Sequence, residues 1–197
     1  FLKYDQQRMI RMFCHDYDAE FLYLRLLDRR YRVSRKRGTI DWEDESSWRP
    51  AGFLDAMTIY DLLCCAKDGA ALSGRYAQAE HLPGTMHGAN PAKGAFDEFA
   101  ARCDEAPEKL KKACLALGGV ELPMGELSFQ VPLFDFLPVM VQFWSSDDEF
   151  PAVFKLMWDE NVLQFLRFET VCYAARFLVT RLQEHMGLPV FGGEGHM

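Results

Sequence analysis

The amino-acid sequence predicts a single α+β domain in which a mostly antiparallel sheet packs against several helices. Strand-like and helix-like segments occur in groups rather than in strict alternation, which favours this class. The 49% hydrophobic and 26% charged fractions are typical of a soluble globular protein, and 197 residues suit one domain. We expect the domain to cover residues 1–191 and the glycine-rich residues 192–197 to form a flexible tail.

A basic hairpin is predicted near the start of the chain. Residues 20–26 and 30–36 alternate between apolar and polar side chains, and the short Asp28-Arg29 link joins them. Residues 25–37 hold seven basic residues against one acid, so one face of the hairpin should be basic. Such a face predicts an acidic protein partner, with a solvated sheet face as the alternative.

A mostly buried helix is predicted over residues 52–67, after a weakly helical stretch at 3–13 and a polar stretch at 38–49. Its narrow polar stripe includes Asp55 and Asp61. Because a lone buried carboxylate is costly, these two side chains should face water, a base or a ligand.

The glycine-rich stretch 69–94 shows neither helix nor strand periodicity. A stretch of this length inside a compact domain is usually functional or mobile. Residues 72–76, with the sequence LSGRY, combine a hydroxyl, a flexible backbone and a guanidinium, as an anion site requires. Histidine supplies the titratable group of such a site. The candidate ligand-binding residues are Asp55, Asp61, Ser73, Arg75, Tyr76, His81 and His87.

The second half of the chain alternates groups of helices and strands. Periodicity predicts helices at 96–103 and 107–117, strands at 127–133, 138–144 and 153–158, a short helix at 162–166 and a long amphipathic helix at 169–186.

Two carboxylates should meet at one end of these three strands if they form an antiparallel meander. Asp135 lies in the first turn, and Asp159 follows the third strand. Oxygen ligands of this kind suit Mg²⁺ or Ca²⁺, so the pair is a candidate metal site. The alternative is that both are turn carboxylates that accept hydrogen bonds from nearby amides. The acids 147–149 should lie at the opposite end.

Charge, hydropathy and cysteine spacing exclude several classes. The net charge of −7 argues against nucleic-acid binding, and no apolar stretch is long enough for a transmembrane helix. We expect no signal peptide, and six cysteines without regular spacing indicate reduced thiols in the cytoplasm.

Several segments, taken in order, resemble the domain-of-unknown-function family 3786. They are RRYRVSRKRGTI (29–40), IYDLLCCAKDGAALSGRY (59–76), HLPG (81–84), LGG (117–119), FWSSDDEFPAVF (143–154) and LQFLRFET (163–170). The resemblance covers about residues 20–186. It implies a cytosolic role in anaerobic metabolism, alongside cofactor or metalloenzyme systems, and brings no catalytic residue with it.

The leading functional hypothesis is a cytosolic protein that binds a small ligand or cofactor. Its pocket would be formed by the 72–90 loop, the polar stripe of the 52–67 helix and aromatic residues of the 133–158 sheet. One rival is a protein–protein interaction module without a small ligand, which uses the basic hairpin. The other is a hydrolase that depends on a divalent metal held by Asp135 and Asp159.

Overall fold

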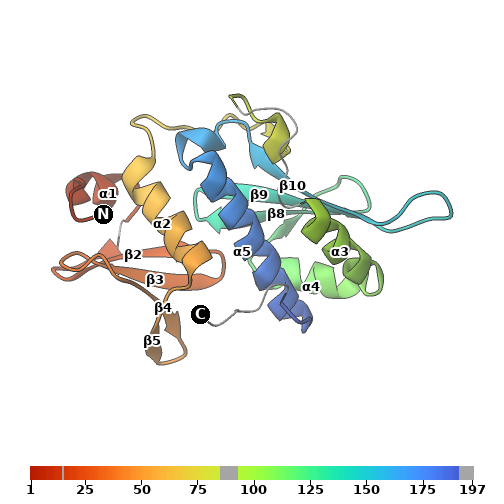
Figure 1. Cartoon of the computed structure of the whole chain (residues 1–197), viewed down its shortest axis with the longest axis horizontal. Helices are drawn as coiled ribbons and strands as arrows, with labels where there is room; N and C mark the ends of the chain where they lie inside the picture. The colour runs from red at the N-terminus through yellow and green to blue at the C-terminus, as the bar shows by residue number, and fades with distance from the viewer. Residues whose placement is uncertain (15, 85–92, 191–197) are drawn as a thin grey trace.

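A computed structural model describes residues 1–14, 16–84 and 93–190 and confirms the α+β class. It contains two five-stranded antiparallel sheets, with strand orders β1-β2-β3-β4-β5 and β6-β10-β9-β8-β7. The sequence predicted one sheet. Figure 1 shows the two sheets in different halves of the molecule, with the helices α2 and α5 running between them.

The first sheet contains the predicted hairpin. Its strands are β1 (Asp16–Tyr17), β2 (Phe21–Leu26), β3 (Arg29–Ser34), β4 (Ile40–Asp44) and β5 (Ser47–Pro50). Leu26 pairs with Arg29 across the turn, so the turn residues are Leu27 and Asp28, one residue earlier than the predicted Asp28-Arg29 link.

A second hairpin, β4–β5, occupies the segment 38–49, which the sequence suggested only as a polar stretch. Ile40 is buried and Trp42 packs against the core, while Asp41 and Glu43 point to the other face of β4. The sequence of β4 therefore does alternate between apolar and polar residues. The polar positions are acidic residues, which are also common in turns, so the strand was not recognised.

The second sheet is the predicted meander with a short strand at each edge. Its strands are β6 (Tyr76–Ala77), β7 (Val120–Glu121), β8 (Leu127–Phe134), β9 (Leu137–Trp144) and β10 (Val153–Asp159). The ladder between β8 and β9 shifts register between Pro132 and Phe134, next to the turn that carries Asp135. A proline in β8 offers no ladder donor, which fits an irregularity at that point.

The helices pack between and beside the sheets. They are α1 (Gln6–Met12), α2 (Phe53–Cys65), α3 (Lys93–Asp104), α4 (Pro107–Ala116) and α5 (Phe168–Met186), with 3₁₀ turns η1 (Ala79–His81) and η2 (Val162–Gln164). The long helix α5 packs against both α2 and α4, and α3 lies against β10. Buried positions that recur every three to four residues on α5 make one side of this helix part of a continuous core.

Two of the contacts that join the β2–β3 hairpin to the rest of the molecule involve its turn residues, Leu27 and Asp28. The Leu27 amide donates to the Leu133 carbonyl at 2.8 Å, which links the first sheet to β8. In the hairpin turn, Asp28 accepts hydrogen bonds from Arg181 of α5 at 3.1 and 2.6 Å. These contacts fix the hairpin beside the β8–β9 turn. The candidate site lies between the hairpin and this turn.

Candidate functional site

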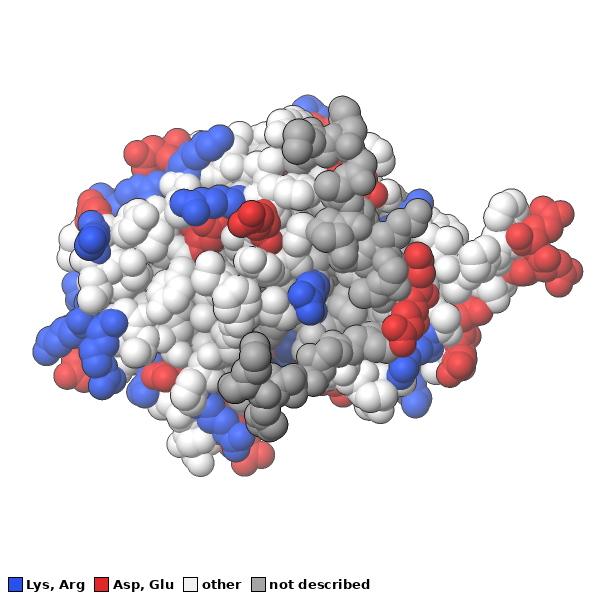
Figure 2. Space-filling view, viewed as in Figure 1, with Lys and Arg blue, Asp and Glu red and all other residues white. Residues whose placement is uncertain are grey.

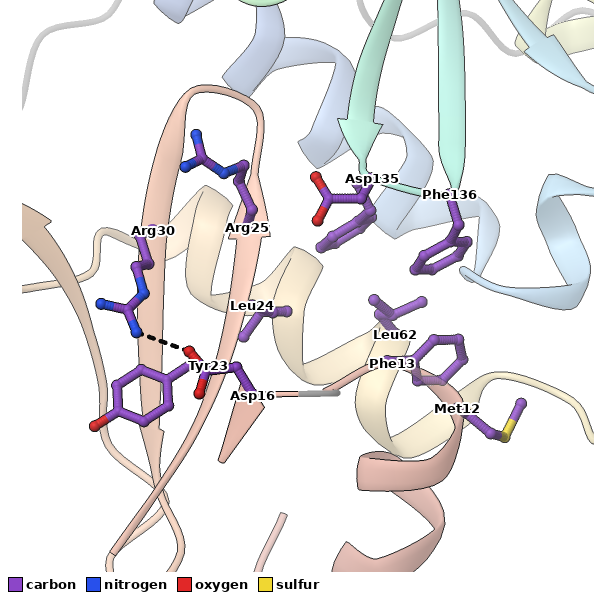
Figure 3. Close-up of a pocket in the computed structure, with 11 residues that line it drawn as sticks. Met12, Phe13, Asp16, Tyr23, Leu24, Arg25, Arg30, Leu62, Asp135 and Phe136 are labelled. Carbon is purple, nitrogen blue, oxygen red and sulfur yellow. Dashed lines mark hydrogen bonds and ion pairs between the residues drawn. The ribbon is translucent and has the colours of Figure 1, made fainter. Parts of the chain in front are cut away.

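A pocket lies where the β2–β3 hairpin, the end of α1 and the β8–β9 turn meet (Figure 3). Its volume is about 510 Å³. Ligand sites commonly occupy roughly 300–1,000 Å³ and combine apolar walls with a few polar groups. The lining residues are Met12, Phe13, Asp16, Tyr23, Leu24, Arg25, Arg30, Leu62, Phe134, Asp135 and Phe136.

One wall of the pocket is aromatic. Phe13 and Phe136 stack with their ring centroids 5.3 Å apart, and Phe134 stacks with Phe136 at 6.0 Å. Phe165 supports Phe136 from behind at 5.7 Å. Because these rings hold one another in place, the wall offers a rigid apolar surface.

The opposite wall carries two of the hairpin's arginines, Arg25 and Arg30. Arg30 donates to Asp16 at 2.8 Å, lies 3.7 Å from Glu43, and stacks over the Tyr23 ring at 4.6 Å (Figure 3). The Tyr23 hydroxyl in turn donates to Asp18 at 2.9 Å. Burial and this hydrogen bond raise the pKa of Tyr23, so its hydroxyl stays protonated at neutral pH.

Arg25, the other arginine of this wall, forms no ion pair with an acidic residue in the described part of the chain. It pairs directly with Arg30 across β2 and β3, and its side chain is exposed. Among described residues, its guanidinium makes neither a hydrogen bond nor an ion pair. Figure 3 shows it across the pocket from Asp135, whose exposed carboxylate is equally unpartnered among those residues.

Among the described residues, no strand pairs with the edge of β2 beside Arg25. Strand β1 pairs only with Leu22 and Tyr23, and the next contact on this edge is the Leu27 amide with Leu133. Hydrogen-bonding direction alternates along a strand, so the Arg25 amide and carbonyl point to this same edge. Within the described segments neither group has a backbone partner.

The outer face of the first sheet is less basic than the sequence predicted. Arg32 stacks over Phe21 and Trp48, in each case at 4.5 Å, and pairs with Asp41 at 3.0 Å. Arg29 lies on the opposite, core-facing side of the sheet, where it stacks over Trp42 at 4.1 Å. Carboxylates from neighbouring strands therefore offset much of the charge that the hairpin contributes, although Figure 2 still shows basic side chains at this end of the molecule.

The predicted residues Ser73, Arg75 and Tyr76 gather at the end of β10, away from the pocket. Both carboxylate oxygens of Asp159 are occupied by hydrogen bonds from the amides of Ser73, Gly74 and Asn161 at 2.8–2.9 Å and from the Ser73 hydroxyl at 3.1 Å. Burial raises the pKa of Asp159, but these hydrogen bonds lower it below its usual value. Arg75 pairs with Glu160 at 2.6 Å, and Tyr76 pairs with Asp159 in the sheet.

The two carboxylates of the α2 stripe are buried and engaged separately. Asp55 accepts a hydrogen bond from the Tyr31 hydroxyl at 2.9 Å, and burial raises its pKa. Asp61 accepts from the Arg167 amide at 2.6 Å, at the start of α5. The Arg167 guanidinium also donates to Cys65 at 2.9 Å, but burial raises the pKa of this thiol, so it is not a thiolate at neutral pH.

The remaining candidates are not brought together. His81 is exposed at the end of η1, and His87 lies outside the described residues, as does part of the 72–90 loop. Asp135 lines the pocket, whereas Asp159 does not. Among described residues, no group of three or more histidine, cysteine or acidic side chains is arranged to hold a metal ion.

Several lining residues were missed from the sequence, notably Phe13, Asp16 and Arg25. Alternation did place Arg25 on the polar face of its strand, opposite Leu24 and Leu26. That it faces the β8–β9 turn depends on contacts between segments more than 100 residues apart, such as Leu27 with Leu133.

Taken together, the fold and pocket define an α+β protein with two antiparallel sheets and an arginine- and phenylalanine-lined cavity between them. The family model for a domain of unknown function, DUF3786, matches residues 5–181, and the chain belongs to this family. Neither the curated proteins nor the solved structures contain a significant match. In the described part of the chain, no helix has the length and apolar character needed to cross a membrane.

Proposed function

We propose that this protein binds a small organic ligand in the pocket between the β2–β3 hairpin and the β8–β9 turn. The carrying observation is Arg25, an exposed arginine without a counterion among described residues, at the mouth of a cavity of about 510 Å³. A free cation beside a rigid aromatic wall suits a ligand that is apolar along its body and polar at one end.

The proposed setting is the cytosol. All six cysteines are free, and burial raises the pKa of each of Cys14, Cys103 and Cys114 to about 12. Such cysteines act as small apolar core residues. Cysteines that form no disulfide are typical of proteins in the reducing cytosol. A role beside cofactor or metalloenzyme systems in anaerobic metabolism is the part of this proposal that rests on the family resemblance alone.

Protein purified without oxygen should be examined by native mass spectrometry and absorption spectroscopy. A retained ligand appears as excess mass or as a chromophore. In parallel, binding of the neutral fluorescent probe N-phenyl-1-naphthylamine tests whether the pocket accepts a flat apolar molecule.

A pocket-filling substitution locates the binding. Leu24→Trp places a larger side chain in the lining, whereas Leu115→Trp adds the same side chain at an exposed position of α4 that does not line the pocket. We expect Leu24→Trp to lower probe affinity at least tenfold and Leu115→Trp to leave it unchanged, with both variants melting near the parent temperature. Equal probe binding by all three proteins would refute the assigned site.

Protein docking on the outer face of the first sheet is a second candidate, favoured by the stacking of Arg32 between Phe21 and Trp48. Arginine and aromatic residues are enriched at protein interfaces. This candidate predicts a clean apo mass together with a co-purifying acidic protein. The complex should be lost in Trp48→Ala and retained in Leu24→Trp.

A further inference from the structure

We propose that the ligand is amphoteric: it carries an anionic group that Arg25 binds, a neighbouring cationic or hydrogen-bond-donating group that Asp135 binds, and a flat apolar body to one side of them. This inference rests on the proposed function, because it names the class of ligand that the same pocket takes. An aromatic amino acid or a related arylalkylamine with a carboxylate has this chemistry.

The anionic group follows from the pairing of Arg25 with Arg30. Like charges directly opposite each other on neighbouring strands are destabilising. Arg30 has Asp16 at 2.8 Å and Glu43 at 3.7 Å to offset its charge, whereas Arg25 has no such partner among the described residues. A ligand carboxylate on Arg25 would supply the missing charge in bidentate geometry.

The open edge of β2 strengthens this anion site. The Arg25 amide points to the edge that β1 leaves unpaired, between Tyr23 and Leu27. An exposed strand edge offers main-chain donors to an incoming group. The guanidinium and the amide of one residue are therefore both available to a ligand that enters beside the hairpin.

The second polar group follows from Asp135. The β8–β9 turn holds this carboxylate on the opposite side of the pocket from Arg25 (Figure 3). The two side chains form no ion pair with each other in the structure, although both are exposed and of opposite sign. A ligand with an ammonium and a carboxylate can contact both at once, which a simple anion cannot.

The apolar body follows from the aromatic wall beside these two groups, with Phe13 and Phe136 on the side of Asp135 away from Arg25 (Figure 3). Phe13, Phe134 and Phe136 form a continuous stack with centroid separations of 5.3 and 6.0 Å. Offset stacking against such a wall favours flat rings over branched aliphatic chains. The pocket volume of about 510 Å³ leaves room for a fused two-ring group.

Four indole probes that differ chiefly in their charged groups test the ligand class: L-tryptophan, tryptamine, indole-3-propionate and 3-ethylindole. Calorimetry, or a thermal-shift assay that detects unfolding with an added dye instead of tryptophan fluorescence, should rank L-tryptophan as the tightest-binding of the four. Charge-assisted hydrogen bonds contribute about 1.5–3 kcal/mol, which corresponds to roughly ten- to hundredfold in affinity.

Two substitutions should divide the affinity. Arg25→Gln should reduce binding of L-tryptophan and indole-3-propionate at least tenfold and leave tryptamine unchanged, while Arg25→Lys restores part of the loss. Asp135→Asn should weaken the binding of L-tryptophan and tryptamine and leave the binding of indole-3-propionate unchanged. Lys36→Gln and Asp148→Asn remove exposed charges of the same signs away from the pocket and serve as matched controls.

The outcomes separate the two proposals. If the four indoles bind equally well, or if neither variant changes their ranking, the ligand class is wrong while the pocket assignment stands. If none of the indoles binds but N-phenyl-1-naphthylamine still binds and is blocked by Leu24→Trp, the same conclusion holds. If Leu24→Trp changes the binding of no probe, the pocket assignment itself fails.

Discussion

Replacing Arg181 with methionine should destabilise the protein by about 2–3 kcal/mol. The Arg181 side chain is 10% exposed and Asp28 is 20% exposed, and they share hydrogen bonds of 3.1 and 2.6 Å. Breaking a buried ion pair by removing one partner costs about 3–5 kcal/mol. We place the expected value lower because Asp28 is partly hydrated and keeps His185 at 2.9 Å.

Urea unfolding of the parent, Arg181→Met and the control Arg176→Met measures this cost. Arg176 lies on the same helix but is exposed, so its replacement should change the free energy of unfolding by less than about 0.5 kcal/mol. Asp28→Asn and the double variant complete a cycle, with an expected coupling of about 1–2 kcal/mol. A cost for Arg181→Met no larger than that of the control would refute the argument that this ion pair fixes the hairpin.

The pH dependence of the same difference gives an independent check. Burial raises the pKa of Asp28, but hydrogen bonds from Arg181 and His185 outweigh it and hold the pKa below its usual value. A carboxylate with a lowered folded-state pKa stabilises the fold above its unfolded pKa of about 3.9, and this stabilisation is lost as pH falls through the folded value. The gap between parent and Arg181→Met should therefore be full at pH 6 and narrow below about pH 4.

Two further predictions concern the buried carboxylates of Asp159 and Asp55. Asp159→Ala should cost about 1–3 kcal/mol, since it leaves the amides of Ser73 and Gly74 without their acceptor, and limited proteolysis should then cut near residue 74 faster than in the parent. Asp55→Asn should act oppositely with pH: burial raises the pKa of Asp55, so its ionisation costs stability as pH rises above about 3.9. Urea unfolding should show Asp55→Asn gaining on the parent between pH 4 and pH 7, and no gain would mean that Tyr31 fully stabilises the charged form.

Local patterns predicted the elements that local forces decide. The hairpin at 20–36 was predictable because alternation and a two-residue turn agree, and the three central strands of the second sheet were predictable for the same reason. The β4–β5 hairpin was not, because Asp41 and Glu43 on its outer face read as turn residues until Arg30 and Arg32 supply their partners. The division into two sheets also depends on contacts that no local window contains.

The candidate site shows where this limit matters for function. Meander topology correctly placed Asp135 and Asp159 beyond the same end of the sheet. If both carboxylates had been exposed to solvent, they would have been a plausible pair of metal ligands. Ser73 and Gly74, distant in sequence, donate to the oxygens of Asp159 and leave Asp135 as the carboxylate that faces a cavity. The cation across that cavity comes from the hairpin, whose charge in the sequence suggested a protein partner. Arg30 and Arg32 on the outer face of the hairpin are both paired with acidic residues. Among the described residues, Arg25 is therefore the arginine of this face that is free to bind a ligand. It lies across the pocket from Asp135.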